Sequence, residues 1–168
     1  MRRYLIILLI SFLVFPLVAQ NTNCACCSEK YQEFDFWIGT WVVTNANGTP
    51  AGKNTIKKIQ DNCALLENWT SATPGFTGTS QNFYNAKSKQ WEQIWIDNQG
   101  SSLHLKGHKI GNQMVLESEK NVNTKGQVLY HRITWTQHKD GTVRQLWETI
   151  TDNTNVVIAF DGIYTKEN

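Results

Sequence analysis

The sequence predicts an all-β protein, and three observations support that fold class. From residue 39 onward, short segments rich in β-branched and aromatic residues alternate with turn residues, and the apolar positions have no helical period. Turn signals such as Asn47-Gly48, Gly111-Asn112 and Asp140-Gly141 separate these segments. The segments follow one another through short connections, which is typical of an up-and-down antiparallel sheet. We therefore predict a roughly ten-stranded antiparallel sheet that closes into a barrel, because closure removes the two exposed sheet edges.

Each expected strand is one such segment between two turn signals. In chain order, the expected strands are residues 39–45, 52–60, 63–71, 79–86, 90–97, 101–108, 112–118, 128–137, 142–150 and 156–166. Residues 28–37 contain the one expected helical turn, which would sit ahead of the first strand as a short N-terminal plug. A two-sheet sandwich is the alternative architecture, because strand number and spacing do not separate it well from a barrel.

The first nineteen residues have the pattern of a secretory signal peptide. Arg2 and Arg3 give a positive start, residues 4–15 form an apolar run, and residues 17–19 offer a small-residue cleavage site. A membrane anchor is the weaker alternative, because the apolar run is short for a bilayer span and Pro16 ends it. We expect an exported protein, periplasmic or secreted, with no stable membrane anchor after signal cleavage.

The remaining chain has the length of one ordinary domain. The expected organisation is a signal peptide at 1–19, a cysteine-bearing N-terminal segment at 20–33 and one β-barrel domain at 34–168. Once Arg2 and Arg3 are removed from the 16 Lys and Arg residues, 14 basic residues remain beside 14 acidic ones. Such a neutral chain without a long basic run is not expected to bind nucleic acid.

Export changes the interpretation of the four cysteines, because disulfides form in oxidising compartments. We expect Cys63 to pair with one of Cys24, Cys26 and Cys27, and the sequence does not choose among them. The bond would close a loop of about 37 to 40 residues and stabilise the fold by about 3 to 4 kcal/mol on the chain-entropy account. A zinc site is the rival interpretation, but adjacent cysteines fit the spacing of tetrahedral ligands poorly. No metal site is therefore expected.

A short aromatic segment, "EFDFWIGTWVV" at residues 33–43, opens the first strand and contains the pattern GxW at Gly39 to Trp41. The chain resembles the calycins, the lipocalin-like barrels that carry this pattern. It is more closely similar to an uncharacterised group of exported bacterial lipocalin-like proteins that begin with FDFWxGxW. The matching pieces are spread along nearly the whole chain after the signal peptide: "FDFWIGTW", "CALLENW", "GTSQNFYNAKSKQWEQIWID", "MVLE", "RITW", "RQLWE" and "FDGIY".

The resemblance implies a fold and little chemistry. It implies that Gly39 and Trp41 close one end of the barrel and that a basic residue of the last strand, here Lys166, covers the tryptophan ring. A lysine over an exposed indole contributes about 0.5 to 1 kcal/mol through cation–π attraction. Phe34, Phe36 and Trp37 are expected to complete a hydrophobic seal with Trp41.

Strand alternation indicates which residues share a face with each tryptophan. Three expected strands repeat a polar residue two positions before a tryptophan: Glu67 and Trp69, Gln93 and Trp95, and Gln145 and Trp147. The same faces of two further strands carry Asn82 with Tyr84 and His131 with Trp135. The opposite faces carry residues suited to water: Glu92, Arg132, Thr134, Arg144 and Glu148.

An interior that mixes indole rings with amides, a carboxylate and an imidazole is typical of a small-molecule site. We therefore expect a small apolar or amphipathic ligand inside the barrel. The expected ligand-binding residues are Glu67, Trp69, Asn82, Tyr84, Gln93, Trp95, His131, Trp135, Gln145 and Trp147. The alternative is a structural network, in which Glu67, Gln93 and Gln145 satisfy one another and fix the strand register.

Two other functions compete with ligand binding. Glu67 and His131 could form an acid/base couple of a barrel enzyme, but no GxSxG, HExxH or phosphate-binding glycine loop accompanies them. A solid-cored envelope interaction module is the third hypothesis. His131 is also the only histidine expected to face inward and so the only candidate to ligate haem, but a lone inward histidine is more often a core residue. No cofactor and no catalytic residue is assigned.

Overall fold

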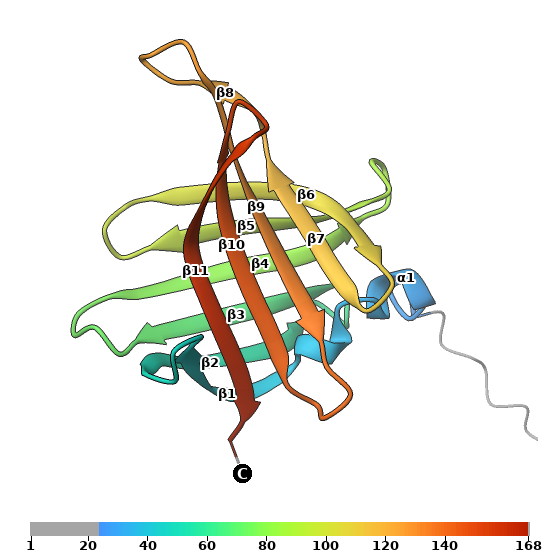
Figure 1. The fold of residues 1–168 in the computed structure, drawn as a ribbon. Helices are drawn as coiled ribbons and strands as arrows, with labels where there is room; N and C mark the ends of the chain where they lie inside the picture. Colours follow the sequence, from blue (N-terminus) through green and yellow to red (C-terminus); the bar gives the residue numbers. More distant parts are fainter. Residues whose placement is uncertain (1–23, 168) are drawn as a thin grey trace, which may run out of the picture.

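The chain forms a closed up-and-down barrel of ten antiparallel strands in the computed structural model, which describes residues 24–167 (Figure 1). The ten strands are β1 (Gly39–Asn45), β2 (Pro50–Ile59), β3 (Ala64–Ser71), β4 (Thr77–Asn85), β5 (Gln90–Asp97), β6 (Ser102–Ile110), β7 (Gln113–Ser118), β9 (Val128–Gln137), β10 (Val143–Thr151) and β11 (Asn155–Lys166). A two-residue strand, β8 (Asn121–Val122), pairs with β9 alone among the described strands. The expected signal peptide lies outside the described residues.

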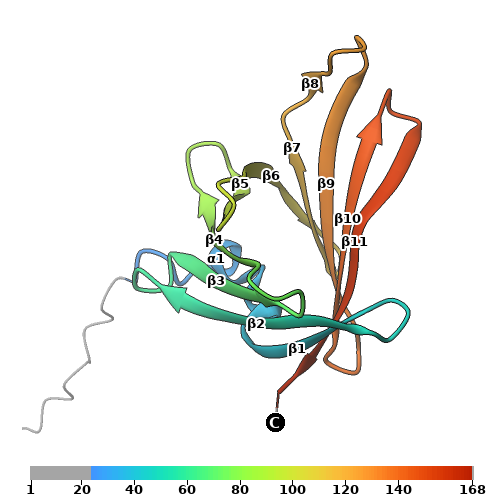
Figure 2. The same cartoon turned by 90° about the vertical axis from the view of Figure 1, so that its left-hand side faces the viewer.

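Hydrogen bonds close the ring completely. Consecutive strands pair from β1 to β7, β7 pairs with β9, β9 with β10, β10 with β11, and β11 returns to β1 with Trp41 opposite Lys166. This continuous ring excludes the two-sheet sandwich. Figures 1 and 2 show β8 and the neighbouring ends of β9, β10 and β11 extending beyond the other strands.

The expected fold class is confirmed, and every expected strand boundary lies within two residues of the observed one. The sequence did not indicate β8. This strand has two exposed residues in the loop before β9, and two residues are too short for any alternation to be visible.

The plug consists of two short helical turns, α1 (Glu29–Gln32) and η1 (Asp35–Trp37), at one end of the barrel. Phe34 and Trp37 have no exposed surface; their rings stack at 5.0 Å, and Phe34 meets the ring of Trp135 edge-on at 5.2 Å. The Nε1 of Trp41 donates a hydrogen bond of 2.9 Å to the carbonyl of Trp37. Burying this much aromatic surface explains the composition of the segment before β1.

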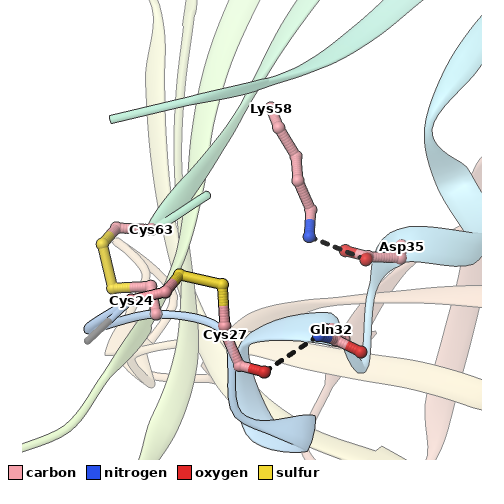
Figure 3. Close-up of a disulfide and its surroundings, with 7 residues drawn as sticks. Cys24, Cys27, Gln32, Asp35, Lys58 and Cys63 are labelled. Atoms are coloured by element: carbon pink, nitrogen blue, oxygen red, sulfur yellow. Dashed lines mark hydrogen bonds and ion pairs between the residues drawn. A yellow bond between two sulfur atoms is a disulfide. The ribbon is translucent and has the colours of Figure 1, made fainter. Parts of the chain in front are cut away.

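Trp41 and Lys166 meet in the same region. Lys166 Nζ lies 5.5 Å from the centroid of the Trp41 ring, within cation–π range. Trp41 itself is fully buried. An ion pair of 2.7 Å between Lys58 and Asp35 fastens η1 to β2 (Figure 3).

Two disulfides fix the segment before the plug. Cys26 pairs with Cys63 in the turn between β2 and β3, across a separation of 37 residues, and Cys24 pairs with Cys27 (Figure 3). Gln32 Nε2 donates to the carbonyl oxygen of Cys27, which holds α1 against the smaller loop. Disulfides of this kind indicate an oxidising, extracytoplasmic setting. Among the described residues, no helix is long and apolar enough to cross a membrane.

Candidate functional site: a cavity at the unplugged end

The barrel contains a cavity of about 360 Å³ at the end away from the plug. The plug packs on the end of β4, where Tyr31 meets Tyr84, whereas the cavity is bounded by the β3–β4 turn at the start of the same strand. The lining residues are Asn45, Pro50, Ala51, Glu67, Trp69, Ser71, Ala72, Thr73, Phe76, Gln93, Trp95, Asp97, Leu103, Ile133, Gln145, Trp147, Ala159, Phe160 and Tyr164. This volume is at the lower end of the range for small-molecule sites.

Aromatic rings form much of the cavity wall. Trp69, Trp95, Trp147 and Phe160 come from β3, β5, β10 and β11, and Phe76 comes from the β3–β4 turn. The rings of Trp69 and Phe160 meet edge-on with their centroids 6.0 Å apart. Such walls offer flat apolar surface together with electron-rich ring faces.

Three of these rings lie directly against glycines. A Cβ placed on Gly78 would lie less than 3.0 Å from the ring of Trp95, and one on Gly162 would lie equally close to the ring of Phe160. Gly52 has the same relation to Trp69. Each ring can therefore lie flat on the barrel wall rather than point into the lumen.

A network of buried polar side chains lies beside the cavity, with Glu67 at its centre. Asn54 Nδ2 donates to Glu67 Oε1 at 2.6 Å, and Ser80 Oγ donates to Glu67 Oε2 at 2.5 Å. Ser80 Oγ in turn accepts hydrogen bonds from Asn82 Nδ2 at 2.8 Å and from Gln93 Nε2 at 3.3 Å. Gln93 Nε2 also donates to Asn82 Oδ1 at 2.8 Å. The network thereby joins the four consecutive strands β2, β3, β4 and β5.

The network continues to the other side of the barrel through Asn54. Its Nδ2 lies 3.4 Å from the hydroxyl of Tyr164 and donates to it, and that hydroxyl donates to Gln145 Oε1. Glu67, Gln93 and Gln145 therefore belong to one structural network, and all three also line the cavity. The sequence left open whether these three side chains form a structural network or line a cavity, and in the structure they do both.

Burial governs the protonation of this network. Only 4% of the Glu67 surface is exposed, and burial raises the pKa of its carboxyl group from 4.5 to about 7, against the hydrogen bonds from Ser80 and Asn54 that lower it. Burial, followed by the neighbouring charge of Glu67, raises the pKa of Tyr164 well above its ordinary value. Glu67 therefore changes charge near neutral pH.

Six of the ten residues expected to bind ligand line the cavity: Glu67, Trp69, Gln93, Trp95, Gln145 and Trp147. Asn82 is fully buried and reaches the cavity only through its bonds to Gln93 and Ser80. Trp135 is fully buried against the plug, and Tyr84 packs on Tyr31 and Trp91 at the same end. Alternation predicts which face of the sheet these residues occupy, but it does not predict their position along the barrel axis.

His131 also lies away from the cavity lining. Its Nδ1 accepts a hydrogen bond of 3.1 Å from Trp147 Nε1 and lies 3.2 Å from Thr149 Oγ1, and burial lowers its pKa. None of its hydrogen-bond partners is shared with Glu67. Within residues 24–167, no group of three or more His, Cys, Asp or Glu side chains is placed to hold a metal ion.

One outward-facing residue differs from the expectation of a water-exposed face. Glu92 is only 6% exposed and accepts hydrogen bonds from Asn85 Nδ2 at 2.7 Å and His104 Nε2 at 2.9 Å. Burial alone would raise the pKa of Glu92, but these bonds outweigh it and lower the pKa. Strands β7, β9, β10 and β11 keep an ordinary outer face, where Arg132 pairs with Glu117 and Arg144 pairs with Asp161.

Sequence reasoning missed part of the site. The missed residues are Gly52, Asn54, Phe76, Gly78, Ser80, Phe160, Gly162 and Tyr164. Asn54 lies in regular alternation with Ile56 and opposite Trp69 of β3, but its own strand contains no tryptophan to mark the inner face, and the search for polar residues beside tryptophans therefore passed over it. The glycines gave a usable signal, because each lies within one or two strand positions of an aromatic residue on the same or the adjacent strand.

No protein-family model matches this chain, and no curated protein matches it. The ten-stranded antiparallel barrel is consistent with the lipocalin-like resemblance of the sequence.

Proposed function

We propose that this protein is an exported, lipocalin-like binding protein that holds a small, partly apolar ligand in the cavity of its barrel. The observation that supports this most is the position of the Glu67 network, which lines one part of an otherwise aromatic cavity. Apolar walls with a few convergent polar groups are the usual composition of small-molecule sites. The two disulfides support a periplasmic or secreted location.

The alternatives receive less support from the same residues. A solid-cored interaction module would not need three glycines beneath the cavity rings. An enzyme that used Glu67 and His131 as an acid/base couple would need them to act on one substrate, yet their hydrogen bonds lead to different partners.

The proposal is tested by blocking the mouth of the cavity with a bulky residue. Ala72 is exposed in the β3–β4 turn, lines the cavity and donates its backbone N–H to Ala51. Ala46 is the matched control: it is an exposed turn alanine whose backbone N–H donates to Asp161, but it does not line the cavity. The probe is N-phenyl-1-naphthylamine, an uncharged dye that fluoresces in apolar sites.

We expect Ala72→Trp to lower the affinity for the dye at least about tenfold, which is roughly 1.4 kcal/mol of binding free energy. Ala46→Trp should bind the dye as the unmodified protein does. Equal affinities for the dye in all three proteins, or no binding to the unmodified protein, would contradict the proposal. Native mass spectrometry of protein purified from its own envelope should in addition detect a copurifying small molecule.

A further inference from the structure

The charge of the cavity lining has one sign. Among the described residues that line the cavity, Glu67 and Asp97 carry carboxyl groups, and none is Lys, Arg or His. None of the ion pairs formed by residues 24–167 includes Glu67. The buried carboxyl group therefore has hydrogen-bond donors but no positive partner from the described protein.

The hydrogen bonds around Glu67 are arranged for its ionised form. Both oxygens of Glu67 accept, from Asn54 and Ser80, and Ser80 is itself supported by donors on Asn82 and Gln93. Donors that converge on a carboxyl group stabilise the carboxylate. A buried carboxylate without a counter-charge is nevertheless costly, so burial and the network act in opposite directions. A cation in the cavity would remove this conflict.

A neighbouring group lacks a hydrogen-bond donor. Asn54 Oδ1 is buried and has no hydrogen-bond partner in the described part of the chain. The amide of Asn54 is held to Glu67 by its nitrogen, so both residues belong to the same acceptor-rich region. An ammonium group supplies several N–H donors and a positive charge together.

The cavity walls suit the rest of such a ligand. Trp69, Trp95 and Trp147 present indole rings, which attract cations more strongly than other aromatic side chains do. The rings also cover an apolar body by ordinary burial. Aromatic walls around a carboxylate are the combination that recognises alkylammonium groups.

We infer that the cavity binds an organic cation, in which an ammonium group pairs with Glu67 and an apolar or aromatic body packs among the indole rings. This inference rests on the proposed function, since it names the ligand class of the same cavity. Anionic ligands are disfavoured, because Glu67 and Asp97 would repel them.

Binding of a cation is coupled to the protonation of Glu67. The titratable groups that contact Glu67 or share its cavity are Tyr164 and Asp97; Tyr164 stays neutral near pH 7 because its pKa is raised. The free protein holds Glu67 partly protonated at neutral pH, since its pKa is about 7. An ammonium group favours the carboxylate, so its binding releases a proton, and its affinity increases as the pH rises through neutrality.

The test uses three probes that differ only in the head group: 2-phenylethylamine, 2-phenylethanol and 3-phenylpropionate. Their affinities are measured by isothermal titration calorimetry at pH 8. We expect the amine to bind at least about tenfold more tightly than the alcohol, since hydrogen bonds to charged groups are the stronger class. The carboxylate should bind most weakly. Repeating the amine titration at pH 7 in buffers of different ionisation enthalpy should detect the released proton.

Two variants assign the preference to one carboxyl group. Glu67→Gln keeps a hydrogen-bonding side chain but removes the charge, and should reduce the amine-to-alcohol affinity ratio to about one. Glu92→Gln is the matched control, because Glu92 is also a buried strand carboxylate but faces the outside of the barrel. It should leave the ratio unchanged. Thermal unfolding of each variant identifies any loss of folding.

The possible outcomes separate this inference from the proposed function. If the unmodified protein binds the amine no more tightly than the alcohol, the organic-cation inference is overturned, while retained binding of the alcohol and the dye leaves the proposed function standing. If neither the alcohol, the amine nor the dye binds, both fail. An amine preference that persists in Glu67→Gln also overturns the inference, because the charge would then come from elsewhere.

Discussion

Glu67 carries the central physical conflict of this molecule at the scale of one residue. Its carboxyl group is buried, which favours the neutral form, while Asn54 and Ser80 donate to it, which favours the ionised form. Burial is the larger effect, so the pKa rises to about 7. A pair of well-placed donors alone does not replace water and a counter-ion around a carboxylate.

This raised pKa predicts a pH dependence of stability with a definite sign. Between the unfolded pKa of 4.5 and the folded pKa of about 7, the folded state holds a proton on Glu67 that the unfolded state has released. The contribution of Glu67 to the free energy of unfolding is therefore present at low pH and is lost as the pH rises toward neutrality, by about 3 kcal/mol in total. Urea denaturation from about pH 5 to about pH 7.5 measures it.

The comparison is made against Glu67→Gln, which has no such titration. His131 contributes in the opposite direction, since its lowered pKa removes stability as the pH falls, but it does so in both proteins. The difference in unfolding free energy between the unmodified protein and the variant should therefore decrease with rising pH. A difference that stays constant or increases would show that Glu67 is not titrating in this range.

The candidate site could be predicted only in part, for reasons that lie at the residue scale. Period-two alternation predicts that Glu67, Gln93 and Gln145 face the lumen, because it fixes the face of a side chain. Alternation does not encode position along the barrel axis, so Trp135 at the plug and His131 beyond the cavity received the same assignment. Asn54 was missed for a different reason: strand β2 has no tryptophan, so nothing in its own sequence marked the face that Asn54 shares with Trp69 across the strand pair.

At the scale of elements, the plug depends on covalent as well as hydrophobic attachment. α1 has four residues and η1 has three, which is too short for either to be stable alone. Cys26–Cys63 fastens the chain before α1 to the β2–β3 turn, and Phe34 and Trp37 anchor its other end in the aromatic core. The segment is thus held on both sides.

The two disulfides should differ in their effect on stability. Cys26–Cys63 closes a loop of 37 residues, and replacing both cysteines by serine should lower the free energy of unfolding by about 3 to 4 kcal/mol on the chain-entropy account. Cys24–Cys27 spans only three residues, so its double replacement should cost about 2 kcal/mol or less. Denaturant unfolding of both double variants provides the comparison. Equal losses would indicate that loop closure is not the source of the stabilisation.

The strands were easier to predict than the disulfide pairing. Alternating residues and turn signals such as Asp140-Gly141 are local, and each strand follows from a window of about ten residues. The choice between Cys24, Cys26 and Cys27 for Cys63 depends on where the plug meets the β2–β3 turn, which is a contact between segments far apart in the sequence.

At the scale of the whole molecule, the barrel has two different ends and two populations of tryptophan. Trp37, Trp41, Trp91 and Trp135 lie toward the plug and are at most 2% exposed. Trp69, Trp95 and Trp147 are partly buried and line the cavity. The seven tryptophans of the chain are divided between the two ends in this way.

Fluorescence quenching should resolve the two populations. Acrylamide, which is uncharged, should quench a fraction of the emission readily and the remainder poorly, and Trp95→Phe should reduce the readily quenched fraction. Because the cavity carries carboxyl groups and no basic side chain among the described residues, caesium should reach its tryptophans better than iodide does. A single quenchable population, or a preference for iodide, would contradict this division of the barrel.

The glycines under Trp69, Trp95 and Phe160 determine the bore of the barrel. The empty space in the lumen depends on positions that have no side chain. A single methyl group added at Gly78 would displace the indole of Trp95 toward the lumen and narrow the cavity. The diameter of this space is therefore encoded at three backbone positions, and substitutions there can adjust it while every lining side chain keeps its identity.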